Sequence, residues 1–104
     1  MKNETTILVE NLSVVIPVYN DEEVLQELHR RLKPVLDTIA QQYEVVLVDD
    51  GSKDHSWDEI LKLREMDEHI VAVKLARNFG QQNSIAAGLN VSKGEIVVLM
   101  DSDL

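Results

Sequence analysis

Two carboxylates stand one residue apart near the C-terminal end of the sequence. Asp101-Ser102-Asp103 directly follows Ile96-Val97-Val98-Leu99-Met100, an apolar run typical of a buried strand. Mg²⁺ and Mn²⁺ accept carboxylate oxygens as ligands, and in proteins these metals usually also hold substrate phosphates. An acid-x-acid pattern is common by chance, so it is the position after a strand that favours a metal site here.

A second acidic motif, Asp49-Asp50-Gly51-Ser52, follows another apolar run. Carboxylates just past a strand end can accept hydrogen bonds from a nucleotide base or a ribose, and Gly51 lets the backbone turn sharply. The same four residues also suit an ordinary turn that leads into a helix cap. Taken alone, the motif leaves both interpretations open.

A third motif, Arg77-Asn78-Phe79-Gly80, stands directly before a predicted helix. An arginine beside the free N–H groups of a helix N-terminus can bind an anion, although a surface arginine before any helix has the same pattern. We predict that Phe79 belongs to the core. The sequence lacks G-x-G-x-x-G, G-x-x-x-x-G-K-[ST] and G-x-S-x-G, which argues against the usual dinucleotide, phosphate-loop and nucleophile-elbow sites.

These motifs need a scaffold that brings distant strand ends together. Apolar runs rich in β-branched residues predict strands at residues 13–18, 44–49, 70–75 and 95–100. Strands that alternate with helices over short connections predict a parallel sheet, so we expect a Rossmann-like three-layer α/β/α fold with strand order 3-2-1-4. Residues 1–12 are expected to be a loose lead-in, and residues 13–104 to be the domain.

Three helices are predicted between these strands. The first is capped by Asn20 and kinks or ends near Lys33, because Pro34 interrupts its pattern. The second starts after Asp54 or Ser56. The third runs over residues 81–90, with Gly94 as its terminator and an inward face that we predict from its larger apolar residues, Ile85, Ala86 and Leu89.

Ligands of such sheets bind at the carboxyl ends of the strands, where the strand order reverses. In this sequence that edge would gather side chains that are far apart along the chain, namely Pro17, Tyr19, Asp49, Asp50, Asp101 and Asp103. Both acidic motifs would then face one site, which makes the joint interpretation as a nucleotide and metal pocket stronger than either motif alone.

Composition narrows the class of protein further. The 104 residues carry a formal net charge of −9, so we expect no binding to nucleic acid, which needs Lys and Arg against its phosphates. There is no cysteine, no apolar run of the ~18 residues that a membrane span needs, and no signal-peptide layout. These features predict a cytoplasmic protein.

The motifs together resemble the family 2 glycosyltransferases of the GT-A fold. The matching stretches are Val14-Val15-Ile16-Pro17-Val18-Tyr19-Asn20-Asp21-Glu22, Val46-Leu47-Val48-Asp49-Asp50-Gly51-Ser52, Arg77-Asn78-Phe79-Gly80, Ala87-Gly88-Leu89 and Asp101-Ser102-Asp103-Leu104. The Arg-Asn-Phe-Gly stretch is most similar to the branch that transfers a sugar to a polyprenyl phosphate, which includes dolichyl-phosphate mannose synthases and bacterial undecaprenyl-phosphate glycosyltransferases. The resemblance covers the chain from about Ser13 onward.

The resemblance implies roles for individual residues. Pro17, Tyr19 and Glu22 would line the nucleotide pocket, and Asp50 would contact the base with Asp49 beside it. Arg77 would lie near the nucleotide or its diphosphate. The catalytic pair would be Asp101 and Asp103, which would hold Mg²⁺ or Mn²⁺ against the diphosphate of the sugar donor.

The resemblance also implies what lies outside this sequence. Members of the family continue into an acceptor-binding half, and many in this branch then carry membrane helices. We therefore expect an N-terminal fragment that holds the donor half-site of an inverting transferase, favours a UDP-sugar over GDP-mannose and is inactive alone. The full-length protein would use a polyprenyl phosphate acceptor at the cytoplasmic face of a membrane.

Two other functions compete with this interpretation, a nucleotide-binding module and a signalling domain. A non-catalytic nucleotide-binding module would use the same pocket without transfer. A response-regulator domain would need an acidic pair after the first strand, where this chain has Pro17-Val18-Tyr19-Asn20. The predicted last strand would have a free apolar edge, so we expect either self-association through that edge or disorder near Asp101.

Overall fold

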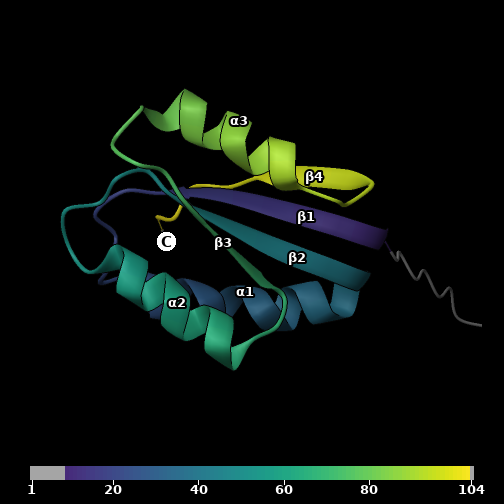
Figure 1. Ribbon diagram of the computed structural model, residues 1–104. Helices are drawn as coiled ribbons and strands as arrows, with labels where there is room; N and C mark the ends of the chain where they lie inside the picture. Colours follow the sequence, from purple (N-terminus) through teal and green to yellow (C-terminus); the bar gives the residue numbers. More distant parts are fainter. Residues whose placement is uncertain (1–8, 104) are drawn as a thin grey trace, which may run out of the picture.

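The structure, a computed structural model, describes residues 9–103. Strands and helices alternate along these residues as β1 (Val9–Val18), α1 (Leu25–Ile39), β2 (Ala40–Asp49), α2 (Ser56–Met66), β3 (Ile70–Lys74), α3 (Gln81–Val91) and β4 (Ile96–Leu99). Every strand pair is parallel and the strand order is β3-β2-β1-β4. Helices α1 and α2 cover one face of the sheet and α3 covers the other (Figure 1). The predicted three-layer fold and strand order are therefore confirmed.

The two central strands start earlier than the apolar pattern predicts. β1 begins at Val9 rather than Ser13, and β2 begins at Ala40 rather than Glu44. The added residues pair with each other, Val9 with Ala40 and Asn11 with Gln42. Their backbone groups form a ladder although several side chains are polar, and a search for apolar runs does not detect such a ladder. Of the expected lead-in over residues 1–12, residues 1–8 lie outside the described residues.

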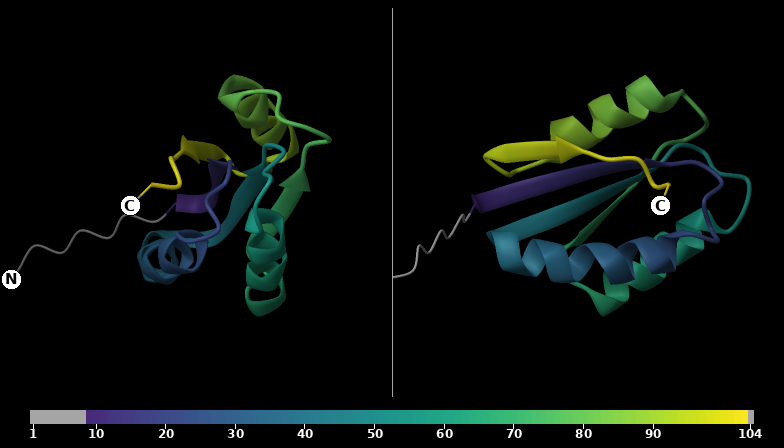
Figure 2. Two further views of the ribbon diagram at one scale, coloured as in Figure 1. Left: turned by 90° about the vertical axis from the view of Figure 1, so that its left-hand side faces the viewer. Right: turned by 180° about the vertical axis from the view of Figure 1, so that it is seen from behind.

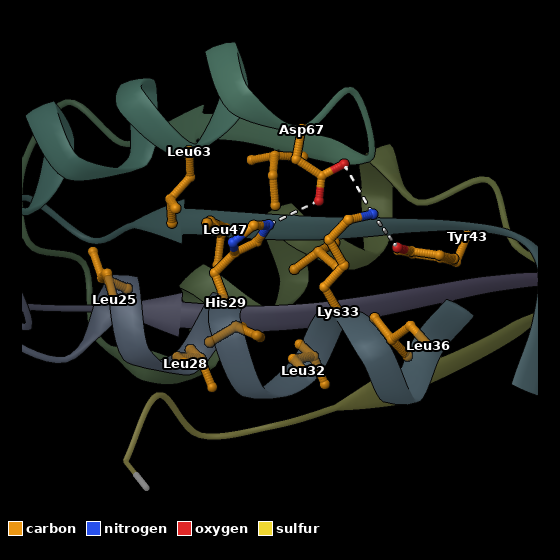
Figure 3. A pocket seen from close by; sticks show the side chains of 13 residues that line it. Leu25, Leu28, His29, Leu32, Lys33, Leu36, Tyr43, Leu47, Leu63 and Asp67 are labelled. Atoms are coloured by element: carbon orange, nitrogen blue, oxygen red, sulfur yellow. Dashed lines mark hydrogen bonds and ion pairs between the residues drawn. The ribbon is translucent and has the colours of Figure 1, made fainter. Parts of the chain in front are cut away.

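The core is aliphatic and has two parts, one on each face of the sheet. Val14, Ile16 and Leu47 face α1 and α2, whereas Val15, Val46 and Val48 face α3. Successive residues of a strand point to opposite faces, so a continuous apolar run is what a strand covered on both sides requires. Figure 3 shows the larger part, where leucines of α1 and α2 meet β2.

Helix α1 differs from its prediction at both of the points where a boundary was expected. It begins at Leu25, not after Asn20, and Asn20 instead adopts a left-handed φ of 54°. It also continues through Pro34 to Ile39. Proline removes one helical hydrogen bond, but Leu36, which follows it, is buried in the core, and this burial favours continuing the helix.

Helix α3 presents small residues to the sheet, so the predicted inward face of Ile85, Ala86 and Leu89 is wrong. Its buried residues are Ser84 and Gly88, whereas Leu89 is exposed. A Cβ on Gly88 would lie 2.4 Å from Val15 Cγ1, so the helix approaches the sheet closely because this side chain is missing. The helix ends at Val91, and Gly94 lies beyond it against the backbone of Ser13.

A buried carboxylate joins α1 to the connection between α2 and β3. Asp67 accepts hydrogen bonds from ring nitrogens of His29 at 2.8 Å and His69 at 2.6 Å. Figure 3 shows the bond from His29 and the nearby Lys33, whose Nζ lies 4.0 Å from the Asp67 carboxylate. Burial alone would raise the pKa of Asp67, but these hydrogen bonds and the backbone N–H of His69 outweigh it and lower that pKa to about 2. This cluster lies away from the carboxyl edge of the sheet and serves stability.

Strand β4 lies at the edge of the sheet and is exposed, although its sequence suggested a buried strand. It is hydrogen-bonded to β1 on one side, and Figure 2 shows it at the margin of the sheet beside α3. The exposed fractions of Ile96, Val97, Val98 and Leu99 range from 37% to 51%. Its second edge and much of its apolar surface are therefore open among the residues that the structure describes.

Candidate functional site

The carboxyl ends of β1, β2 and β4 meet around a hollow of about 200 Å³. In Figure 1 the segment after β4 reaches the end of the sheet where β1 and β2 also finish. The residues that line the hollow are Pro17, Val18, Tyr19, Asp21, Asp50, Gln81, Asp101, Ser102 and Asp103. Of the predicted site residues, the fold brings Pro17, Tyr19, Asp50, Asp101 and Asp103 together here, whereas Glu22, Asp49 and Arg77 lie outside the lining.

The acidic pair after β4 is open to solvent, and the residue between the two acids is not. The backbone N–H of Met100 bonds the carbonyl of Val15, which is the last rung that ties this segment to β1. Asp101 and Asp103 are exposed, and Asp101 Oδ1 accepts a hydrogen bond from Gln81 Nε2 at 3.3 Å. Ser102 between them is only 6% exposed. Both carboxylates are thus available to a ligand in the hollow.

Asp50 is buried and organises the loop that follows β3. Its carboxylate accepts the backbone N–H of Phe79 at 2.8 Å and of Gly80 at 3.1 Å. The side chain of Asn78 also bonds the Asp50 carbonyl oxygen at 3.1 Å. Each carboxylate oxygen can accept more than one hydrogen bond, so Asp50 can hold this loop and still face the hollow.

Asp49 points away from the hollow. Its neighbour Leu47 packs under α1 and α2, and alternation along the strand turns the Asp49 side chain to the same face. It is 1% exposed, and Asp49 Oδ1 has no hydrogen-bond partner among residues 9–103. A buried carboxylate oxygen without a donor costs desolvation free energy, so Asp49 lowers stability beside the site.

Arg77 lies on the outer side of the loop. Its guanidinium carbon is 4.2 Å from the ring centroid of Phe79, and Phe79 is 42% exposed, so the prediction that Phe79 is a core residue is wrong. The backbone of this loop packs against Gly51, which has a φ of +70°. A Cβ on Gly51 would lie only 2.3 Å from the backbone nitrogen of Asn78. Gly51 thus provides the predicted turn and also the space for this loop.

Glu22 belongs to a contact between two loops. Its carboxylate accepts the backbone N–H of His55 at 3.3 Å, and its own N–H bonds the carboxylate of Asp54 at 3.2 Å. Asn20 strengthens the same contact, because its N–H bonds Ser52 Oγ at 2.9 Å and its Oδ1 accepts the Lys53 N–H at 2.8 Å. These bonds join the loop after β1 to the loop after β2 and thereby fix the wall of the hollow.

Sequence reasoning assigned no role to three polar residues of the hollow, Asp21, Gln81 and Ser102. Asp21 Oδ2 accepts the hydroxyl hydrogen of Ser102 at 2.6 Å and the backbone N–H of Tyr19 at 3.1 Å. Gln81 is the first residue of α3 and bonds Asp101. The signal for Asp21 was its place three residues after β1, at the predicted ligand edge, whereas nothing in the pattern singled out Gln81.

The lining residues fit a hard divalent cation. No group of three or more His, Asp or Glu side chains within residues 9–103 is arranged to hold a metal by itself. Mg²⁺ does not need such a group, since proteins bind it through one or two carboxylates while substrate phosphates and waters complete the shell. Asp101 and Asp103 supply two oxygen donors at an open hollow that is otherwise acidic, and a diphosphate would approach such a hollow only with a cation.

Comparison with known proteins identifies the family. Residues 13–104 match Glycosyl transferase family 2. This chain belongs to that family. It is 48% identical over 95 residues to the undecaprenyl-phosphate 4-deoxy-4-formamido-L-arabinose transferase of Edwardsiella ictaluri and 42% identical over 97 residues to that of Photorhabdus laumondii. These matches cover 89% and 92% of this chain but only 29% and 30% of the relatives' length.

Solved structures agree on the GT-A fold. S. aureus TarS 1-349 in complex with UDP superposes with a TM-score of 0.78 at 32% identity, covering 89% of this chain and 27% of that one. The mannosyltransferase PcManGT from Pyrobaculum calidifontis, in complex with GDP-Man and Mn²⁺, has a TM-score of 0.81 at 23% identity, covering 98% and 31%. No helix within residues 9–103 is long and apolar enough to cross a membrane.

Proposed function

We propose that this chain is the donor-binding part of an inverting glycosyltransferase that transfers a sugar from a nucleoside diphosphate to a polyprenyl phosphate. The observation that carries the proposal is the hollow at the carboxyl edge, where Tyr19 and Asp50 face Asp101 and Asp103. Membership of family 2 and the names of the relatives support the reaction class. The whole reaction would need residues beyond these 104, since the relatives are much longer.

The residues of the hollow divide the work of donor binding. Pro17 and Tyr19 line the nucleotide side, and Asp50 accepts a hydrogen bond from the base. Asp101 and Asp103 would hold Mg²⁺ or Mn²⁺, and the metal would supply positive charge that stabilises the diphosphate leaving group. These two carboxylates are the catalytic residues of the proposal because they touch the metal of the reacting group.

Three predicted site residues, Glu22, Asp49 and Arg77, lie outside the lining of the hollow and have supporting roles in the proposal. Arg77, whose guanidinium lies over the ring of Phe79, would be near the nucleotide or its diphosphate when the donor is bound. Glu22 holds the loop that carries Tyr19, and Asp49 lies behind Asp50. In the proposal Arg77 contacts the bound donor, whereas Glu22 and Asp49 support the nucleotide pocket without touching the nucleotide.

The reaction itself is a direct displacement. An oxygen of the polyprenyl phosphate attacks the anomeric carbon from the side opposite the diphosphate, the bond between that carbon and the diphosphate oxygen breaks, and configuration inverts. The acceptor is already an anion, so the step needs no strong general base. We favour a UDP-sugar over GDP-mannose because the TarS complexes with UDP and UDP-GlcNAc are more similar in sequence to this chain than the GDP-Man complex is.

The chemistry of the acceptor indicates where the enzyme works. A polyprenyl phosphate is a lipid, so the full-length protein would act at a membrane surface, and we place it on the cytoplasmic face. We also propose that these 104 residues self-associate through the open edge of β4, because within residues 9–103 that edge has no strand partner and carries exposed apolar side chains.

Calorimetric titration tests the binding function. UDP is expected to bind in the presence of Mn²⁺ more tightly than GDP, and Asp103→Ala is expected to weaken UDP binding by tenfold or more, on the order of 1.4 kcal/mol, because one metal ligand is lost. Asp37→Ala, which removes an exposed acid of α1, is the matched control and should bind as the unchanged chain does. UDP binding that is independent of both Mn²⁺ and Asp103 would contradict the proposal and favour the non-catalytic nucleotide-binding module.

Transfer is tested separately. With a radiolabelled UDP-sugar and vesicles that contain polyprenyl phosphate, these 104 residues are expected to form no glycolipid, whereas a full-length relative should form it. Measurable transfer by the 104 residues would overturn the assignment of this chain as the donor half-site alone.

A further inference from the structure

The segment that carries the two exposed acids is held at its middle residue. Ser102 is 6% exposed, whereas Asp101 before it and Asp103 after it are exposed. The segment lies beyond the last backbone bond to β1, from Met100 to Val15, so no strand ladder fixes its direction. Side-chain contacts are therefore what ties these residues to the rest of the site.

The strongest of these contacts is the hydrogen bond from Ser102 Oγ to Asp21 Oδ2, at 2.6 Å. A hydroxyl that donates to a carboxylate makes a charge-assisted bond, which is shorter and stronger than a bond between neutral groups. The only other side-chain bond recorded for this segment within residues 9–103 is the 3.3 Å contact between Gln81 and Asp101. The Ser102–Asp21 bond is thus the tighter anchor.

Asp21 is itself held in place. Its Oδ2 also accepts the backbone N–H of Tyr19 at 3.1 Å, and its own N–H bonds the hydroxyl of Ser56 at 2.8 Å. Ser56 is fully buried at the start of α2, and its N–H bonds Asp54 at 2.8 Å. A chain of hydrogen bonds therefore runs from α2 through Asp21 to the middle of the acidic segment.

From this arrangement we propose that Asp21 and Ser102 are a positioning pair, which orients Asp101 and Asp103 toward the metal and ties the segment to the loop that carries Tyr19. Neither member ligates the metal. The inference rests on the proposed function and adds to it two residues whose effect on metal binding passes through the neighbouring acids. Groups that orient metal ligands commonly change metal affinity by about 10–100-fold when they are altered.

A double-mutant cycle on metal affinity tests the pair. Mn²⁺ binding in the presence of saturating UDP is measured by electron paramagnetic resonance for the unchanged chain, Ser102→Ala, Asp21→Asn and the double variant. We expect each single variant to weaken Mn²⁺ binding by about tenfold and the double variant to be no worse than either, because both changes remove one interaction. Ser102→Thr keeps the hydroxyl and should retain most of the affinity.

Three results would refute the proposal that Asp21 and Ser102 position the two acids. One is additive losses in the double variant, which would make Asp21 an independent metal ligand. The second is full Mn²⁺ affinity in Ser102→Ala. The third is an equal weakening of UDP binding measured without metal, together with a lower melting temperature, which would mean a structural role only.

A variant of a proposed metal ligand distinguishes failure of the positioning pair from failure of the proposed function. Asp103→Asn removes a metal ligand directly and leaves the Ser102–Asp21 bond in place. If Asp103→Asn does not weaken Mn²⁺ binding, the metal site itself is wrong and the pair is wrong with it. If Asp103→Asn weakens binding and the cycle shows no coupling, the positioning pair alone is refuted.

Discussion

At the residue scale, single side chains serve the site through contacts that no local pattern reveals. Asp50 was predicted to contact a nucleotide base, and it does line the hollow, but it also bonds the backbone of Phe79 and Gly80, 29 and 30 residues further along the chain. Gly51 was predicted to allow a turn, and it also leaves room for Asn78. A sequence shows residue types and spacing, whereas contacts of this kind depend on how two loops meet.

Asp67 is the residue whose contribution to stability depends most clearly on pH. Its pKa falls from 3.8 to about 2 in the folded chain, which corresponds to about 2 kcal/mol of stability at neutral pH. A lowered folded-state pKa gives stability that is complete well above the unfolded pKa of 3.8 and is lost as the pH falls toward the folded pKa of about 2. Urea unfolding at pH 7, 4 and 2.5 should therefore show the difference between the unchanged chain and Asp67→Asn shrinking below pH 4.

The matched control is Asp58→Asn, which removes an exposed acid of α2 that pairs with His55 just before the helix. Its effect should be within a few tenths of a kcal/mol, because an exposed ion pair contributes little. If the difference in the free energy of unfolding between the unchanged chain and Asp67→Asn stays constant from pH 7 to pH 2.5, the prediction that the Asp67 carboxylate stabilises the fold only when ionised is wrong.

At the element scale, the strands followed from the sequence more closely than the helices did. Continuous apolar runs with β-branched residues located all four strands, because helices cover both faces of a sheet of this kind and its strands are therefore apolar on both sides. Helix α3 was assigned the wrong inward face because it packs through Ser84 and Gly88, whose small size permits a close approach that hydrophobicity does not record. Helix α1 passes Pro34 because core contacts on both sides of it outweigh one lost hydrogen bond.

Strand β4 carries the prediction for association. At high concentration we expect light scattering to report a mass above that of one chain, because the open edge of β4 can pair with a second copy. Val98→Lys places a charge on this exposed strand, where Val98 is 41% exposed, and should restore a monomer. Met66→Lys changes an apolar residue of α2 that is 67% exposed and should leave association unchanged. A monomeric mass for the unchanged chain at high concentration would refute this prediction.

At the scale of the whole molecule, topology explains why a function could be inferred at all. A parallel sheet of order β3-β2-β1-β4 brings the ends of β1, β2 and β4 to one edge, so motifs more than eighty residues apart face one hollow. That much followed from the spacing of strands and acids. The supporting bonds, from Asp21 to Ser102 and from Glu22 to His55, required coordinates because they join separate loops.

The central claim is that a divalent metal and a nucleotide bind together at this edge. Its most direct test is the paramagnetic broadening of amide signals in nuclear magnetic resonance spectra of the ¹⁵N-labelled chain, with UDP present and a small amount of Mn²⁺ added. We predict that the signals of Tyr19, Asp50 and Asp101 to Asp103 broaden first, while that of Asp67 stays sharp, and that replacing both Asp101 and Asp103 by Asn abolishes the effect. Broadening centred on the acids of α1 and α2, and unchanged in the double variant, would contradict the claim.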